Sequence, residues 1–201
     1  MLTPAEKILF VLAALTSAIL AYRATVRLVR ILSRGHGRPD WKRVPGRLLG
    51  VLVKVGAQLP VFRARPLASL FHALVVWGFS YYLLVNVGDV LQGFLPGFVF
   101  LGDGTLGGVY RLGADILSIA VLVGMTALAI RRFVLRPAVL RVRETTMLHP
   151  RARRGIQRDS AIVAGFILLH VGGRFLGETF HLAESGAAAW QPFASAVSGL
   201  W

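Results

Sequence analysis

Two of the five histidines lie inside long apolar stretches of the chain. His72 occurs in LFHALVVWGF and His170 in GFILLHVGGRF, whereas His36 and His149 lie in basic segments beside glycine or proline. An ionisable side chain within a membrane span is costly to keep there, so it is a candidate functional residue by default. Two neutral imidazoles on two helices can ligate a haem iron from opposite faces. The histidine pair therefore predicts one bound haem.

A purely structural role for both histidines is the alternative. In that case each ring hydrogen-bonds a neighbouring helix and holds no metal. Arg63, Arg65 and Arg174 are candidates for pairing with haem propionates, because a guanidinium group binds a carboxylate through two parallel hydrogen bonds. Small residues near the histidines would let a flat macrocycle, or another helix, approach the backbone closely. They are Gly78, Gly165, Gly172, Gly173 and Gly177.

Four apolar segments are long enough to hold these side chains inside a membrane. Crossing about 30 Å of hydrocarbon takes about 20 apolar residues in a helix. We therefore expect an all-α fold, an integral membrane bundle of about four transmembrane helices in a single domain. The spans are about 5–29, 67–94, 108–133 and 160–183, the last with Asp159 or Ser160 as its cap. Residues 44–60 have helical apolar spacing and a few charges, which predicts an interfacial helix.

The residues after the fourth span, ESGAAAWQPFASAVSGLW, are too few to cross the membrane again. We expect either an interfacial segment anchored by Trp190 and Trp201 or the beginning of a further helix that this chain does not contain. Within the spans, polar residues at i, i+4 spacing are expected to neutralise each other. The pairs are Arg111 with Asp115, and Arg174 with Glu178.

The composition agrees with a membrane protein. Hydrophobic residues make up 55% of the chain and charged residues only 16%, whereas soluble domains carry about 25% charged residues. The net charge of +14 would indicate nucleic acid in a soluble protein. Here the basic residues lie mostly between the apolar runs, so lipid headgroups are the better explanation. Cysteine is absent, which excludes an iron–sulfur cluster ligated by this chain.

The loops differ in charge. The connections between spans one and two, and between spans three and four, are rich in arginine, whereas GFLPGFVFLGDGTLGG between spans two and three has no Lys or Arg. By the positive-inside rule both basic loops are cytoplasmic and both termini lie on the opposite side. Counted from the cytoplasmic side, His72 is roughly 8 Å deep and His170 roughly 15 Å deep at the helical rise of 1.5 Å per residue.

Two stretches are similar to a known group of membrane proteins. ARPLASLFHALVVWGFSYYLL and LGADILSIAVLVGMTALAIRRFVLRPAVL resemble two successive helices of membrane cytochrome b domains. That group is similar to the gamma subunit of respiratory nitrate reductase and the membrane subunit of heterodisulfide reductase. The similarity covers about residues 45–185. It implies a cytochrome b that exchanges electrons between a quinone pool and a partner redox protein.

Within this resemblance, His72 corresponds to an axial ligand. The nitrate reductase gamma subunit has a second histidine about ten residues later on the same helix, where this chain has Tyr82. The family's later histidines would follow Trp201. Either His170 replaces them, or another chain completes the site.

Together these features predict a membrane-anchoring b-type cytochrome subunit in a prokaryotic inner membrane. It would hold one haem b and pass electrons between membrane quinone and a cytoplasmic iron–sulfur or flavoprotein partner. A haem-free anchor or assembly subunit is the first alternative. A transporter component is the second, although the sequence shows no repeated half and no proline at mid-span.

Overall fold

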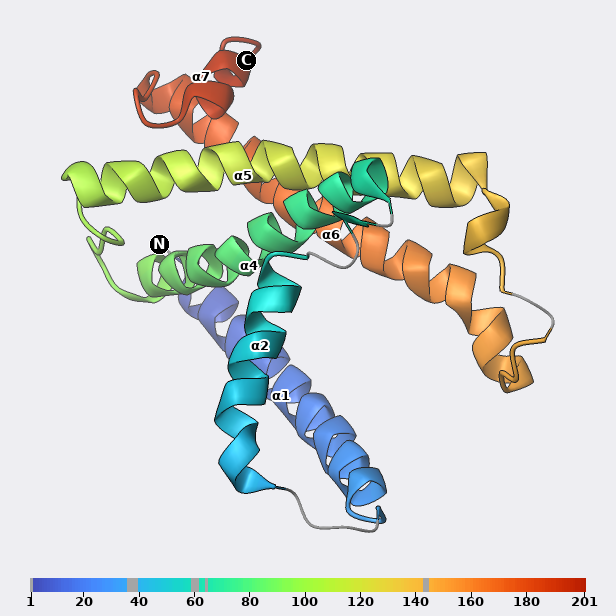
Figure 1. Cartoon of the computed structure of the whole chain (residues 1–201). Coiled ribbons are helices and arrows are strands. Elements are labelled where there is room, and N and C mark those ends of the chain that lie inside the picture. Colours follow the sequence, from blue (N-terminus) through green and yellow to red (C-terminus); the bar gives the residue numbers. More distant parts are fainter. Residues whose placement is uncertain (1, 36–39, 59–61, 64, 143–144) are drawn as a thin grey trace. The chain divides into compact units, whose positions relative to one another are not determined.

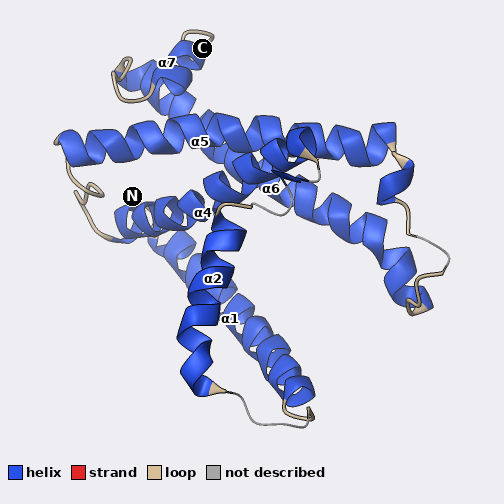
Figure 2. Ribbon diagram, in the orientation of Figure 1, coloured by secondary structure: helices blue, strands red, loops and turns tan. Residues whose placement is uncertain are grey.

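The computed structural model describes residues 2–35, 40–58, 62–63, 65–142 and 145–201. Within those residues all regular secondary structure is helical (Figure 2). The predicted all-α class is therefore confirmed. Arg63 and Arg65 belong to the described residues, whereas the last two residues of the predicted interfacial helix, 59 and 60, lie outside them.

Among the described residues, four helices are long and apolar enough to cross a membrane. The 29 residues of α4 alone extend about 44 Å at the helical rise, which exceeds the hydrocarbon thickness. The α5 helix continues beyond Ala129 as the π-helical segment η2, Ile130–Leu135. All four predicted spans are confirmed as helices: α1 (Pro4–Leu32), α4 (Pro66–Phe94), α5 (Thr105–Ala129) and α6 (Pro150–Ser185).

Shorter helices connect or follow the long ones. A helix is present in the predicted interfacial region, since α2 covers Val44–Gly56, although its position along a membrane surface stays a prediction. Further short elements in the described part of the chain include η1 (Trp41–Arg43), η3 (Ala138–Leu140) and α7 (Pro192–Ser198).

The start of α6 differs most from the prediction. Pro150 occupies the first turn, and the Nδ1 atom of His149 accepts a hydrogen bond from the Arg151 N–H at 3.3 Å. The predicted cap at Asp159 or Ser160 is therefore wrong by about ten residues. The arginines assigned to a loop lie instead on the first turns of the helix, where proline at the start and side-chain capping favour helix over coil.

The chain forms two compact units. The first comprises Met1–Val53 and Val87–Phe100. In it, the first turn of α1 satisfies the carboxyl end of α4: the Leu2 N–H donates to the Gly93 carbonyl at 3.1 Å, and Lys7 Nζ to the Phe94 carbonyl at 3.3 Å. The start of α1 is itself closed by a capping box between Thr3 and Glu6.

The second unit comprises Lys54–Asn86 and Leu101–Trp201. Here α6 packs against and crosses α5 (Figure 1). Close packing of α4 on α5 depends on glycine: a Cβ added at Gly78 would collide with the Val121 side chain, and one at Gly124 would lie 2.7 Å from the Phe71 carbonyl oxygen. Gly78 therefore serves helix packing, the second of the two uses expected for it.

The C-terminal segment folds back onto α5 and α6. The buried carboxylate of Asp115 accepts hydrogen bonds from the Phe193 and Ala194 N–H groups at 2.7 and 3.0 Å, which caps α7 from another helix. Trp201 Nε1 donates to the Thr179 hydroxyl at 3.1 Å. The segment is thus a packed part of the fold, which neither expectation for it had described.

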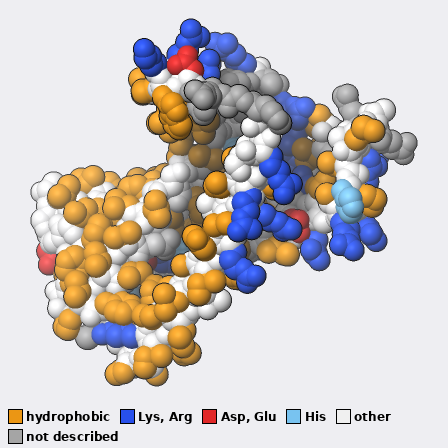
Figure 3. Space-filling view, turned by 90° about the horizontal axis from the view of Figure 1, so that it is seen from below, with side chains coloured by type: hydrophobic (Ala, Val, Ile, Leu, Met, Phe, Trp, Pro, Cys, Tyr) orange, Lys and Arg blue, Asp and Glu red, His pale blue; other side chains and the backbone are white. Residues whose placement is uncertain are grey.

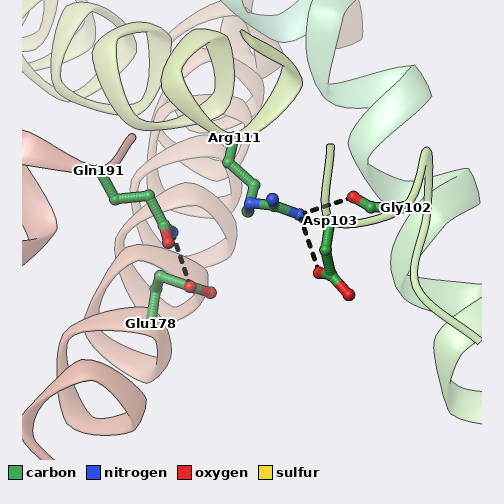
Figure 4. A network of polar contacts seen from close by, with 5 residues as sticks. All are labelled: Gly102, Asp103, Arg111, Glu178 and Gln191. Atoms are coloured by element: carbon green, nitrogen blue, oxygen red, sulfur yellow. Dashed lines mark hydrogen bonds and ion pairs between the residues drawn. The ribbon is translucent and has the colours of Figure 1, made fainter. Parts of the chain in front are cut away.

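At the same end of the second unit, Arg111 and Glu178 have polar partners outside their own helices, and the expected pair of Arg111 with Asp115 is not formed (Figure 4). Arg111 donates to the Gly102 carbonyl at 3.2 Å and lies 4.0 Å from the Asp103 carboxylate, so its partner is a loop residue. Glu178 accepts a hydrogen bond from Gln191 Nε2 at 2.6 Å. Tertiary contacts of the loop and of α7 therefore decide how these charges are satisfied.

Candidate functional site

His72 lies in the second turn of α4, beside the chain segment that follows α2. Its Nδ1 atom is 3.3 Å from the Gln58 side-chain oxygen. An amide oxygen can only accept, so this contact selects the tautomer with hydrogen on Nδ1 and leaves the Nε2 lone pair available. Metal-ligating histidines commonly donate their other ring N–H to an acceptor of this kind. Because the His72 side chain is exposed, that lone pair is accessible.

One contact beside Gln58 supports this position. The Trp77 indole N–H donates to the Gly56 carbonyl at 2.8 Å, which ties the end of α2 to α4. Gln58 itself is buried and has a left-handed backbone, with φ of 50°. A buried residue in this sparsely populated conformation needs support from its surroundings. Nothing in the local sequence marked Gln58 in advance, since it follows an amphipathic helix without any motif.

His170 lies in the middle of α6 in an aromatic environment. Its ring stacks on Phe166 with a centroid distance of 5.7 Å, and it meets the Tyr82 ring edge-on at 6.0 Å. Tyr82 is buried and its hydroxyl is 2.7 Å from the Ser118 Oγ atom. His170 therefore joins an α4–α5–α6 contact, and among the described residues no hydrogen bond reaches its ring.

The two histidines lie at different levels of the bundle. The α4 ring that His170 contacts belongs to Tyr82, ten residues beyond His72, which is about 15 Å of helical rise. The depths of roughly 8 Å and 15 Å expected from the sequence were counted from the predicted starts of the spans. That count could not include the earlier start of α6 or the way α6 crosses α5. No described contact brings His170 to the His72 ring.

The geometry therefore fits a haem ligand at His72 and does not supply an opposed His72–His170 pair within one chain. The described residues also contain no group of three or more histidine, cysteine, aspartate or glutamate side chains that could hold a metal ion. A two-histidine haem site would not need such a group. The ligand role of each histidine remains a prediction.

The three arginines proposed for propionates occupy separate places. Arg63 and Arg65 are exposed and precede α4, on the side of His72, whereas Arg174 is half-buried on α6, four residues beyond His170. Arg65 lines an apolar cavity of about 390 Å³ together with Phe71, the neighbour of His72 in sequence. Arg131 of η2 lines the same cavity. Arg131 was not among the candidate site residues expected from the sequence.

Comparison with models of protein families, with curated proteins and with solved structures gives no match for this chain. The functional conclusion therefore rests on the geometry at His72 and on the resemblance of the two quoted helices.

Proposed function

We propose that this chain is a membrane-anchoring b-type cytochrome subunit that passes electrons between a redox partner and membrane quinone. The observation that carries the proposal is the Gln58–His72 contact at 3.3 Å. It orients an imidazole on a helix that is apolar enough to span a membrane, with Nε2 directed away from its acceptor.

In this proposal His72 holds the haem iron through Nε2, and Gln58 fixes the ring. Arg65 is the best placed of the three arginines to pair with a propionate, because it lines the cavity beside Phe71 together with Arg131. When bound, haem b supplies one-electron redox chemistry. His170 and a histidine from another chain are the two candidates for the opposite axial position. The level of His170 favours the second.

The proposed partners follow from charge and topology. By the positive-inside rule the arginine-rich ends of α1, α5 and α6 face the cytoplasm of a prokaryotic cell, and both termini lie outside the inner membrane. A cytoplasmic iron–sulfur or flavoprotein subunit with an acidic surface would dock on these ends. The haem would then lie between this subunit and quinone in the membrane.

The test is an absorption spectrum of the full chain, expressed with a haem precursor and purified in detergent. We expect a Soret band and a sharper α-band after reduction with dithionite. His72→Ala should lose the bound haem, and His181→Ala, on the exposed end of α6, is the matched control. A wild-type chain without a Soret band would refute a haem site that this chain completes by itself, and a His72→Ala variant with full haem content would refute the proposal.

A haem-free anchor subunit is the second candidate, and the contacts of His170 favour it. Stacking on Phe166 and the edge contact with Tyr82 give that ring a complete packing role without a metal. If this is its only role, His170→Phe should keep the stability of the wild type. The same substitution would halve or abolish haem binding if His170 were an axial ligand.

A further inference from the structure

An arginine-lined cavity lies where α5 ends and α6 begins, and the space-filling view shows Lys and Arg side chains gathered on the surface beside hydrophobic ones (Figure 3). The regular winding of α5 gives way to η2 at Ile130, and the chain turns at Arg136, whose φ of 45° is left-handed. The cavity has a volume of about 550 Å³, and no acidic residue is among its described lining. We call it the arginine basin after five of its lining residues: Arg132, Arg136, Arg141, Arg153 and Arg154.

One of these arginines has donor capacity that the protein leaves unused. The Nε–H of Arg132 is buried and has no hydrogen-bond partner among the described residues. Buried polar groups are normally paired, and a charged group without a partner is the most costly exception. Arg153 differs, since its Nη2 donates to the Thr146 carbonyl at 3.0 Å. Among the described lining residues, Arg132 is therefore the one with a buried nitrogen donor that has no hydrogen-bond partner.

An apolar groove adjoins the basin and shares Arg132 with it. Its volume is about 360 Å³, and it runs between α5 and α6, with Leu128 on one side and Val163 on the other. Met125, Ala129, Phe133 and Ala164 complete its apolar lining. The one acidic lining residue, Asp159, lies 3.5 Å from the Arg158 guanidinium, so its charge is compensated locally. The groove thus offers hydrocarbon surface next to a concentration of positive charge.

We propose that the basin and the groove together bind one anionic phospholipid, with its phosphate in the basin and an acyl chain in the groove. A guanidinium fork matches a phosphate with two parallel hydrogen bonds, and Arg132 reaches both compartments. The site lies at the end of two helices that are apolar enough to span a membrane, which is the level of lipid headgroups. A soluble anion would fill only the basin. A zwitterionic lipid would bring its cation towards five arginines.

The test uses the purified full chain in detergent with an equimolar mixture of phosphatidylglycerol and phosphatidylcholine, and native mass spectrometry counts the lipid retained. We expect at least about tenfold preference for phosphatidylglycerol, because the phosphates of both lipids accept the same hydrogen bonds, whereas the choline cation of phosphatidylcholine is repelled by the arginines of the basin. Equal retention of the two lipids would overturn the proposal. Displacement of phosphatidylglycerol by millimolar inorganic phosphate would identify a site for free anions and would also overturn it.

Three variants separate the two compartments. Arg132→Gln should lose the preference for phosphatidylglycerol. Arg151→Gln is the control, because Arg151 lies at the start of α6 but does not line the basin, and this variant should keep the preference. Val163→Trp fills the groove from an exposed position, so it should lower lipid retention without disturbing the core. If Val163→Trp binds as the wild type does, the acyl chain does not occupy the groove and the proposal fails. None of these readouts depends on bound haem.

Discussion

Asp115→Ala is expected to release the C-terminal segment that contains α7 from α5. The Asp115 side chain is 4% exposed and accepts the Phe193 and Ala194 N–H groups, whereas the N-cap residue of α7, Gln191, makes no side-chain cap of its own. One hydrogen bond to a charged group contributes about 1.5–3 kcal/mol, and a lost cap costs about 0.5–2 kcal/mol. Because the two bonds serve one cap and are not additive, we expect α7 to dock less tightly by about 2–4 kcal/mol.

Limited chymotrypsin digestion of the detergent-purified chain, read by mass spectrometry, measures this change. A loss of about 2 kcal/mol raises the open population about thirtyfold, and cleavage after Phe193 should accelerate accordingly. Asp115→Asn keeps one acceptor oxygen and should fall between the wild type and alanine. Asp103→Ala is the control, since that carboxylate is 86% exposed and only 4.0 Å from Arg111. Equal cleavage rates for Asp115→Ala and Asp103→Ala would refute the reasoning.

Three further substitutions test the α4 contacts. Gln58→Leu should weaken haem binding by about 10–100-fold, measured by haem titration, whereas Gln92→Leu on the exposed surface of α4 should leave it unchanged. Gly78→Val should destabilise the second unit by about 1–3 kcal/mol through overpacking against α5. Gly173→Ala, which has open space around it, should stabilise α6 by about 0.5–1 kcal/mol, and thermal unfolding compares the two. Tyr82→Phe loses the hydroxyl contact at 2.7 Å and should cost about 1 kcal/mol in the same assay, and an unchanged melting temperature would contradict it.

The four spans could be predicted because they depend on local composition. A run of more than about 20 apolar residues has few alternatives to a membrane-spanning helix, whatever surrounds it. The start of α6 could not be predicted in the same way. Its first turns carry Arg151, Arg153, Arg154 and Arg158, so a hydropathy pattern places them in a loop. Pro150 was the available signal, because proline is favoured in the first turn of a helix.

The polar residues within the spans show why sequence spacing alone could not predict which residues form hydrogen bonds or ion pairs. Arg111 and Asp115 are four residues apart on α5, which puts them on one face and makes a local ion pair the simplest expectation. Asp115 is instead used by the backbone N–H groups of α7, about 80 residues later in the chain. A helix of seven residues without a side-chain cap of its own needs such a partner. The sequence does not show that the N–H groups of α7 need an acceptor from α5, because this follows only from the folded position of α7.

Of the candidate site, the histidine could be predicted from the sequence, whereas the residue that contacts it could not. His72 stands out as an ionisable residue in an apolar run, and any reader of the sequence would select it. Gln58, which orients it, lies 14 positions earlier. Its left-handed backbone conformation does not follow from the conformational preferences of glutamine. His170 stands out equally, yet its contacts are with Phe166 and Tyr82. Residue type therefore indicates both histidines, and the acceptor beside one of them makes His72 the stronger candidate for the proposed ligand.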